Sequence, residues 1–195
     1  MTVPNPLARP SRRTLGGTKP LPSMVVLESQ RMTLRYLVPE DLNALFELYR
    51  DPEVRRYFPD GTRTLEETRQ ELEWFRHGHP DHHRLGLWAT LERSSGAFLG
   101  RCGLLPWKID GQHEVELAFL IDKSRWGEGF ATEAATAIAS HAWTALGIQR
   151  LICLITPGNT ASIRVAQKVG MAFERELTDE YGLCHVYSCS ASSMR

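Results

Sequence analysis

Hydrophobic and polar residues alternate in several short stretches of the first 122 residues, a pattern typical of strands with one buried face. These stretches predict strands over 32–37, 85–92, 97–105 and 113–122. A turn is expected between the second and third of them, at 94–96, so this part of the chain should form an antiparallel meander. Three helices are expected between the first two strands, beginning at Pro39, covering 52–58, and running from the cap residue Thr64 to about Phe75.

The pattern changes after residue 128. Small and apolar residues then recur at helical spacing and predict a helix over 129–146, which Gly147 would end. The apolar run at 149–155 predicts a buried strand. A helix over 160–169 and two strands over 171–176 and 183–190 complete the expected order.

The first 23 residues differ in composition from the rest. They hold five prolines and a pair of adjacent glycines without a hydrophobic period, so we expect a disordered tail over 1–23 and a single domain over 24–195. Four basic residues and no acid lie within 1–27; because the formal net charge is zero, the remainder carries four more acids than bases. This balance does not indicate a nucleic acid or an anionic membrane as a partner.

The four cysteines are not arranged as C-x-x-C pairs, which favours free thiols in a reducing compartment. No apolar stretch has the length of a membrane span, and the first residues lack the apolar block of a secretory signal, so we expect a cytoplasmic protein. Four of the seven histidines fall within 77–83, but their spacing matches no established zinc pattern. We therefore expect no metal, and leave open that this segment lies near a substrate.

The segment that indicates chemistry is the loop Trp126-Gly127-Glu128-Gly129-Phe130-Ala131, between a predicted strand and a predicted helix. Unpaired backbone N–H groups at a helix N-terminus form an anion site. The two glycines would let the main chain approach a bulky anion, for which a diphosphate is the obvious candidate. A tight strand-to-helix turn without a ligand is the structural alternative.

This loop resembles the pyrophosphate-binding motif of the GNAT acetyltransferases, and its W-G-E-G-F-A-T-E-A form is similar to the RimJ/RimL branch of that superfamily. A second block, Asn159 to Met171, resembles that branch's N-x-x-S-x-x-V-x-x-K-x-G-[FM] pattern, and the spacing from Arg35 to Asp41 also fits. The resemblance covers about residues 26–190. Trp126 departs from the Gln or Arg that the superfamily often has at the first loop position.

The resemblance implies an α/β (α+β) GNAT-like fold, with a twisted, mostly antiparallel mixed sheet and helices on both faces. Its central parallel pair would be the strands at 113–122 and 149–155, joined by a right-handed crossover through the helix at 129–146. It also implies an N-acyltransferase that moves acetyl from acetyl-CoA to a primary amine by direct attack in a ternary complex. The acceptor would be a protein N-terminus or a small-molecule amine, and a homodimer is left open.

The resemblance further assigns residues to the cofactor. The strand before the loop would hold the pantetheine arm. The loop and the first helical turn would hold the diphosphate, and an asparagine would contact the pantetheine. These residues are Phe119, Leu120 and Ile121, then Trp126, Gly127, Glu128, Gly129, Phe130, Ala131 and Thr132, and finally Asn159. A helix N-cap is the alternative role of Asn159.

Two residues are candidates for proton transfer. The resemblance gives Ser162 the role of protonating the leaving thiolate; its alternative is a first-turn serine bonded to the backbone. Strand alternation places Glu116 opposite an apolar face, so its carboxylate should face the cleft and serve as a base or attract the amine. A solvated or paired strand carboxylate is its alternative, and Asp179 and Glu180 are rival bases.

Two other classes of protein stay open as alternatives. A non-catalytic CoA-binding sensor would lack acid and base groups near the loop, whereas Ser162 and Glu116 are both present. A nucleotide- or phosphosugar-binding protein would need a ribose-binding acid about 20 residues beyond the loop. Gln149 and Arg150 stand there instead.

Overall fold

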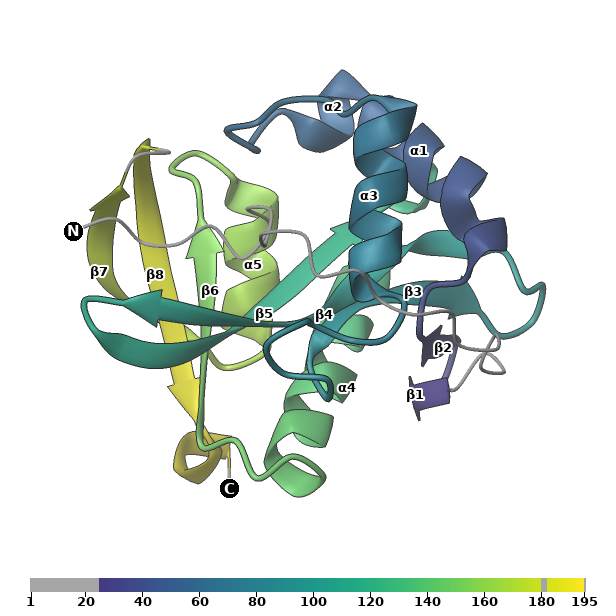
Figure 1. Ribbon diagram of the computed structural model, residues 1–195. Coiled ribbons are helices and arrows are strands. Elements are labelled where there is room, and N and C mark those ends of the chain that lie inside the picture. Colours follow the sequence, from purple (N-terminus) through teal and green to yellow (C-terminus); the bar gives the residue numbers. More distant parts are fainter. Residues whose placement is uncertain (1–24, 180–181, 195) are drawn as a thin grey trace.

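One eight-stranded sheet runs through the protein, described here from a computed structural model that covers residues 25–179 and 182–194 (Figure 1). The expected tail at 1–23 lies outside these ranges. The sheet has the order β1-β2-β3-β4-β5-β6-β8-β7. Its strands are β1 Val25–Glu28, β2 Met32–Arg35, β3 Gly86–Glu92, β4 Phe98–Ile109, β5 Gln112–Ile121, β6 Arg150–Ile155, β7 Ala172–Asp179 and β8 Gly182–Ser190.

Helices cover both faces of the sheet (Figure 1). The helices are α1 Leu42–Arg50, α2 Pro52–Arg55, α3 Leu65–Phe75, α4 Phe130–Thr144 and α5 Thr160–Lys168, with short 3-10 turns at Pro39–Asp41, Lys123–Arg125 and Ala191–Met194. One core joins the sheet to α4 and α5, and a second joins it to α1 and α3. The α/β class with helices on both faces is therefore confirmed.

The alternation of β5 divides its side chains between the two cores. Leu117 and Ile121 pack in the core beneath α4, whereas Ala118 and Leu120 pack in the core beneath α1 and α3. Since side chains two apart along a strand share a face, Glu116 belongs to the face of α1 and α3. This arrangement confirms the predicted alternation.

The parallel pair of the sheet is β5 with β6, as expected, and it is short. Its register holds the single pair Glu116 and Ile152, whereas β5 pairs with β4 along its whole length, from Gln112 to Ile121. All other neighbouring strands are antiparallel. Toward their C-terminal ends β5 and β6 diverge (Figure 1), and this divergence is the feature that positions the candidate site.

Several boundaries differ from the predicted ones. The strand β1 was not predicted, because four residues at a partly exposed sheet edge show almost no pattern. The prediction ended β4 at residue 105, but the strand continues through Pro106 to Ile109. Proline in a run of residues argues against a strand, although here it pairs with Val115 within the ladder.

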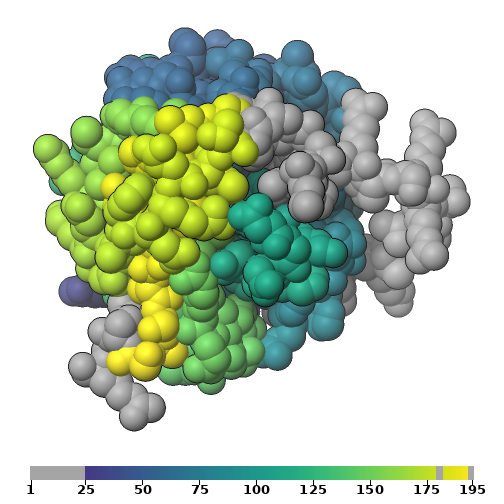
Figure 2. Space-filling model, turned by 90° about the vertical axis from the view of Figure 1, so that its left-hand side faces the viewer, coloured from purple at the N-terminus to yellow at the C-terminus, as the bar shows by residue number. Residues whose placement is uncertain are grey.

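The extended hairpin of β4 and β5 reaches across the far half of the sheet. Trp107 and Ile109 pack with Ile152, Leu177 and Val186 in a third apolar cluster. In Figure 2 the teal residues of this hairpin lie beside the yellow-green residues of β7 and β8. The hairpin thereby places Trp107 beside Glu116, at the point where β5 leaves β6.

Within the two described ranges, no helix is both long and apolar enough to cross a membrane.

Candidate functional site

The glycine loop adopts a backbone that only glycine takes readily. Gly127 and Gly129 have φ angles of 82° and 85°, and Gly129 is the N-cap of α4. The first backbone hydrogen bond of the helix runs from Glu133 N to Gly129 O, at 3.0 Å. The N–H groups of residues 130–132 therefore have no acceptor within the helix, which is the property of an anion site.

Trp126 anchors this loop to the strand that precedes it. Its indole Nε1 donates a hydrogen bond of 2.7 Å to the carbonyl oxygen of Ile121, the last residue of β5. The side chain is 43% exposed, so the ring also offers a surface beside the loop. This contact gives a physical reason for tryptophan at the first loop position.

Two arginines lie against the start of α4. The guanidinium carbons of Arg31 and Arg125 lie 4.2 and 4.7 Å from the ring centroid of Phe130. Arg31, in the β1–β2 turn, donates from Nε to Glu133 at 2.7 Å and from Nη1 to the carbonyl oxygen of Glu128 at 3.1 Å. Arg31 was missed by the sequence reasoning because its partners lie about a hundred residues away.

The glutamate inside the loop is neutralised locally. Arg125 donates to the Glu128 carboxylate at 3.1 Å and to that of Glu92 at 2.7 Å. A carboxylate beside a phosphate would otherwise oppose binding. The predicted loop residue Glu128 is thus paired, and its backbone is fixed by Arg31.

The predicted pantetheine residues Phe119, Leu120 and Ile121 lie beyond the last register pair of β5 with β6. On the β4 side they pair with Cys102, Arg101 and Gly100. No residue of β6 is in register with them. Their main chain on that side can therefore meet an extended ligand, as an added strand would.

Asn159 and Ser162 are brought together by the first turn of α5. The side-chain oxygen of Asn159 accepts from the Ser162 N–H at 3.1 Å, so the N-cap role of Asn159 is present. Within the described part of the chain, the Ser162 hydroxyl makes no hydrogen bond. Tyr57, after α2, donates to the carbonyl oxygen of Gly158 at 3.0 Å and joins the opposite side of the site to this turn.

Glu116 stands where β5 and β6 separate. Its Oε2 accepts a hydrogen bond of 2.7 Å from Trp107 Nε1, and the backbone of Leu154 on β6 also donates to the carboxylate. Burial raises the pKa of the Glu116 carboxyl, although these hydrogen bonds and the charge of Arg101 act in the opposite direction. A carboxyl with a raised pKa beside an unpaired strand edge is a candidate general base.

The rival bases Asp179 and Glu180 stay predictions. Asp179 ends β7, and Glu180 falls outside the described residues. The histidine segment 77–83 leads to Arg84, which donates to the carbonyl oxygen of Ala145 just past the C-terminal end of α4, at 2.6 Å. That end is about 22 Å from the loop, since a helix rises about 1.5 Å per residue. Arg84 therefore lies far from the glycine loop, whereas the nearness of the histidine segment to an acceptor amine stays a prediction. Across residues 25–179 and 182–194, no group of three or more His, Cys, Asp or Glu side chains could hold a metal ion.

Comparison with known proteins identifies the class. Residues 31–172 match the family described as "Acetyltransferase (GNAT) domain", so the chain belongs to the GNAT acetyltransferases. It is 33% identical to the uncharacterized protein YkkB of Bacillus subtilis (strain 168), over 77% of this chain and 87% of that one.

Two solved structures show the same fold. A GNAT-family acetyltransferase from Bacillus anthracis has a TM-score of 0.70 at 22% identity, covering 84% of this chain and 96% of its own. The spermidine N-acetyltransferase from Vibrio cholerae in complex with CoA and spermine has a TM-score of 0.68 at 16% identity, covering 84% and 97%.

Proposed function

We propose that this chain transfers the acetyl group of acetyl-CoA to a primary amine, by direct attack within a ternary complex. One juxtaposition carries the proposal: the unpaired amides at the start of α4 belong to the loop that follows β5, and the last residues of β5 lie beyond its register pair with β6. An anion site followed by a free strand edge suits a diphosphate joined to an extended arm. The Vibrio cholerae relative, solved with CoA and spermine, supports this choice of donor and acceptor.

The residues that would hold acetyl-CoA follow from this geometry. The backbone from Gly127 to Thr132 would bind the diphosphate, with Trp126 fixing the loop to the end of β5. The main chain of 119–121 would hold the pantetheine arm and polarise the thioester carbonyl. Asn159 would contact the arm while it caps α5. Acetyl-CoA, when bound, supplies the activated acyl group.

Two side chains would move protons. The Glu116 carboxylate would accept a proton from the attacking amine, directly or through one water molecule. The Ser162 hydroxyl, which the described residues leave unbonded, would deliver a proton to the departing thiolate. The amine attacks the thioester directly, so no residue of the chain becomes acylated.

We further propose that the protein is a cytoplasmic member of the RimJ/RimL-like branch, with residues 24–195 as its acetyltransferase domain. The block from Asn159 to Met171 supports this placement, and a protein N-terminus or a small-molecule amine would be the acceptor.

The test combines binding with turnover. Acetyl-CoA should bind the purified protein in calorimetry, and thiol release should follow when a panel of amines and peptides is added. Succinyl-CoA is tested in parallel, to compare a longer acyl group with acetyl. Binding of acetyl-CoA without thiol release from any amine would favour a CoA-binding sensor, and absence of binding would overturn the proposal.

A further inference from the structure

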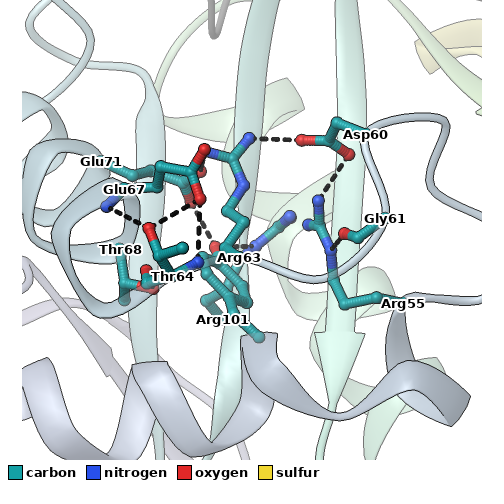
Figure 3. Close-up of polar contacts among 10 residues, drawn as sticks. Arg55, Asp60, Gly61, Arg63, Thr64, Glu67, Thr68, Glu71 and Arg101 are labelled. Carbon is teal, nitrogen blue, oxygen red and sulfur yellow. Dashed lines mark hydrogen bonds and ion pairs between the residues drawn. The ribbon is translucent and has the colours of Figure 1, made fainter.

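A charged network lies between α1, α3 and the face of the sheet that carries Glu116 (Figure 3). Tyr49 of α1 donates its hydroxyl proton to Glu71 of α3 and accepts a hydrogen bond of 2.9 Å from Arg101 Nε of β4. These three residues are at most 4% exposed. The network continues through Arg63 to the loop after α2.

The network holds three guanidinium groups and two carboxylates. Asp60 accepts from Arg55 at 2.5 Å and from Arg63 at 2.6 Å, and Arg63 also lies 3.4 Å from Glu71. The guanidinium of Arg101, in contrast, makes its one hydrogen bond among the described residues to the neutral Tyr49 hydroxyl. Because arginine stays charged, these residues carry one more positive than negative charge, and Arg101 is the guanidinium among them that hydrogen-bonds to no carboxylate of the described residues. The Glu71 and Glu116 carboxylates act on its charge through space.

Arg101 and Glu116 project from the same face of the sheet. In the β4–β5 register Arg101 pairs with Leu120, and Glu116 pairs with Leu105. The pair between them is Gly103 with Ala118. A side chain at Gly103 is excluded, since a Cβ there would lie 1.9 Å from the carbonyl oxygen of Gly86. Two small residues therefore separate a carboxylate from a guanidinium on one sheet surface.

We propose that the acceptor is a primary amine that also carries a carboxylate, its amine directed to Glu116 and its carboxylate to the two Nη atoms of Arg101. The inference rests on the proposed function and names its acceptor class. An arginine whose terminal nitrogens lack partners is suited to bidentate binding of a carboxylate. A bound carboxylate would give Arg101 the direct charge-assisted hydrogen bonds that no carboxylate of the described residues gives it.

The same charge distribution disfavours polycationic acceptors. A polyamine that placed one amine at Glu116 would bring its next ammonium group toward Arg101, with Arg63 and Arg55 behind it. Repulsion between like charges would select against such a ligand. The acceptor class therefore differs from the spermine of the Vibrio cholerae complex.

Matched acceptor pairs test the inference with the full-length protein. A series of unbranched amino acids, with one to five methylenes between amine and carboxylate, is compared with the corresponding carboxamides and with spermidine by acetyl-CoA-dependent thiol release. At least one amino acid should exceed its carboxamide by about tenfold or more in kcat/KM, the size of one charge-assisted contact. Arg101→Gln should reduce that ratio to about one with the KM for acetyl-CoA unchanged, and Arg101→Lys should retain part of it.

Arg50→Gln is the matched control, because Arg50 is an exposed arginine of α1 that pairs with Glu47 and lies outside the network. It should keep the full ratio. Carboxamides or spermidine equal to or better than every amino acid would overturn the inference even if Arg101→Gln did not fold, since that comparison needs only the wild type. Thiol release with none of these amines, nor with the wider panel of amines and peptides, would contradict the proposed function itself, so the two failures are distinguishable.

Discussion

Trp107 and Glu116 meet across the β4–β5 hairpin, where the indole N–H donates a 2.7 Å hydrogen bond to the carboxylate. The contact holds Glu116 at the separation of β5 from β6 and partly offsets the effect of burial on its pKa. Both the position and the protonation of the proposed base therefore depend on this hairpin.

Glu116→Gln should remove the base while keeping the acceptor for the Trp107 N–H. We expect kcat/KM for the amine to fall about 10²–10⁴-fold. In the wild type kcat/KM should rise with pH through a pKa above that of an ordinary glutamate, and this limb should vanish in the variant. A pH–rate profile measures both effects. An unchanged profile would show that another group accepts the proton.

The stability of the same variant provides a second readout. A raised carboxyl pKa contributes stability that is present below the unfolded-state pKa and lost as pH rises through the folded-state value. Gln cannot ionise and avoids this loss. Thermal melts of Glu116→Gln should match the wild type below about pH 4 and exceed it at neutral pH. A lower Tm at neutral pH would indicate that the charged carboxylate stabilises the fold.

Trp107→Phe removes the donor but keeps an aromatic ring in the third apolar cluster. Since the hydrogen bond from Trp107 lowers the Glu116 pKa, its loss should move the rising limb of kcat/KM to higher pH. The plateau at high pH should change less than the midpoint. An unchanged midpoint would show that the rising limb of the pH profile does not report the ionisation of Glu116.

Two substitutions at Gly129 distinguish the effect of a negative charge in the loop from the effect of a side chain at this backbone conformation. Its φ of 85° strains most side chains, but Asn and Asp tolerate this region, and a Cβ here would meet only Arg31 Nη2 at 3.6 Å. Gly129→Asp should abolish measurable acetyl-CoA binding in calorimetry, whereas the isosteric Gly129→Asn should retain part of it. Equal affinity of both variants and the wild type would contradict the diphosphate site.

Ser162→Ala tests the proposed proton donor without disturbing the helix cap. Asn159 accepts from the backbone N–H of residue 162, which alanine keeps. We expect kcat to fall about 10²–10⁴-fold with little change in the KM for acetyl-CoA. Steady-state kinetics with both substrates measures this. A decrease of less than about threefold would assign the proton transfer to water and leave Ser162 with a structural role.

Local signals were sufficient for the parts of the site that lie close together in the sequence. The glycine spacing at 127 and 129 predicted the loop, the small-residue stripe predicted α4, and alternation placed Glu116 on the face opposite the apolar one. Side-chain pairs between distant elements carry no such signal. Arg31 with Glu133 and Arg101 with Tyr49 join residues 102 and 52 positions apart, and they became visible only when the sheet and helices were assembled.

Arg31 is the residue whose effect on cofactor binding should be largest for a side chain outside the loop. It bonds to the Glu128 carbonyl oxygen and to Glu133, and it covers the Phe130 ring, so it fixes both sides of Gly129. Arg31→Ala should therefore raise the KM and Kd for acetyl-CoA about tenfold or more, the scale of a lost charge-assisted contact. The kcat at saturating acetyl-CoA should change much less, because Arg31 touches neither proton-transfer residue.

Arg93→Ala is the matched control for this prediction. Arg93 bonds to the same β1–β2 turn, donating to the Ser29 carbonyl oxygen at 3.1 Å, and its side-chain ion pair goes to Glu28 rather than to the loop. Its loss should leave the affinity for acetyl-CoA near the wild-type value. Arg31→Lys should restore part of the affinity, since lysine keeps the charge but cannot bond to Glu133 and Glu128 as a planar fork. If Arg31→Ala and Arg93→Ala weaken binding equally, the turn acts through its general stability, and Arg31 has no specific role in holding the loop.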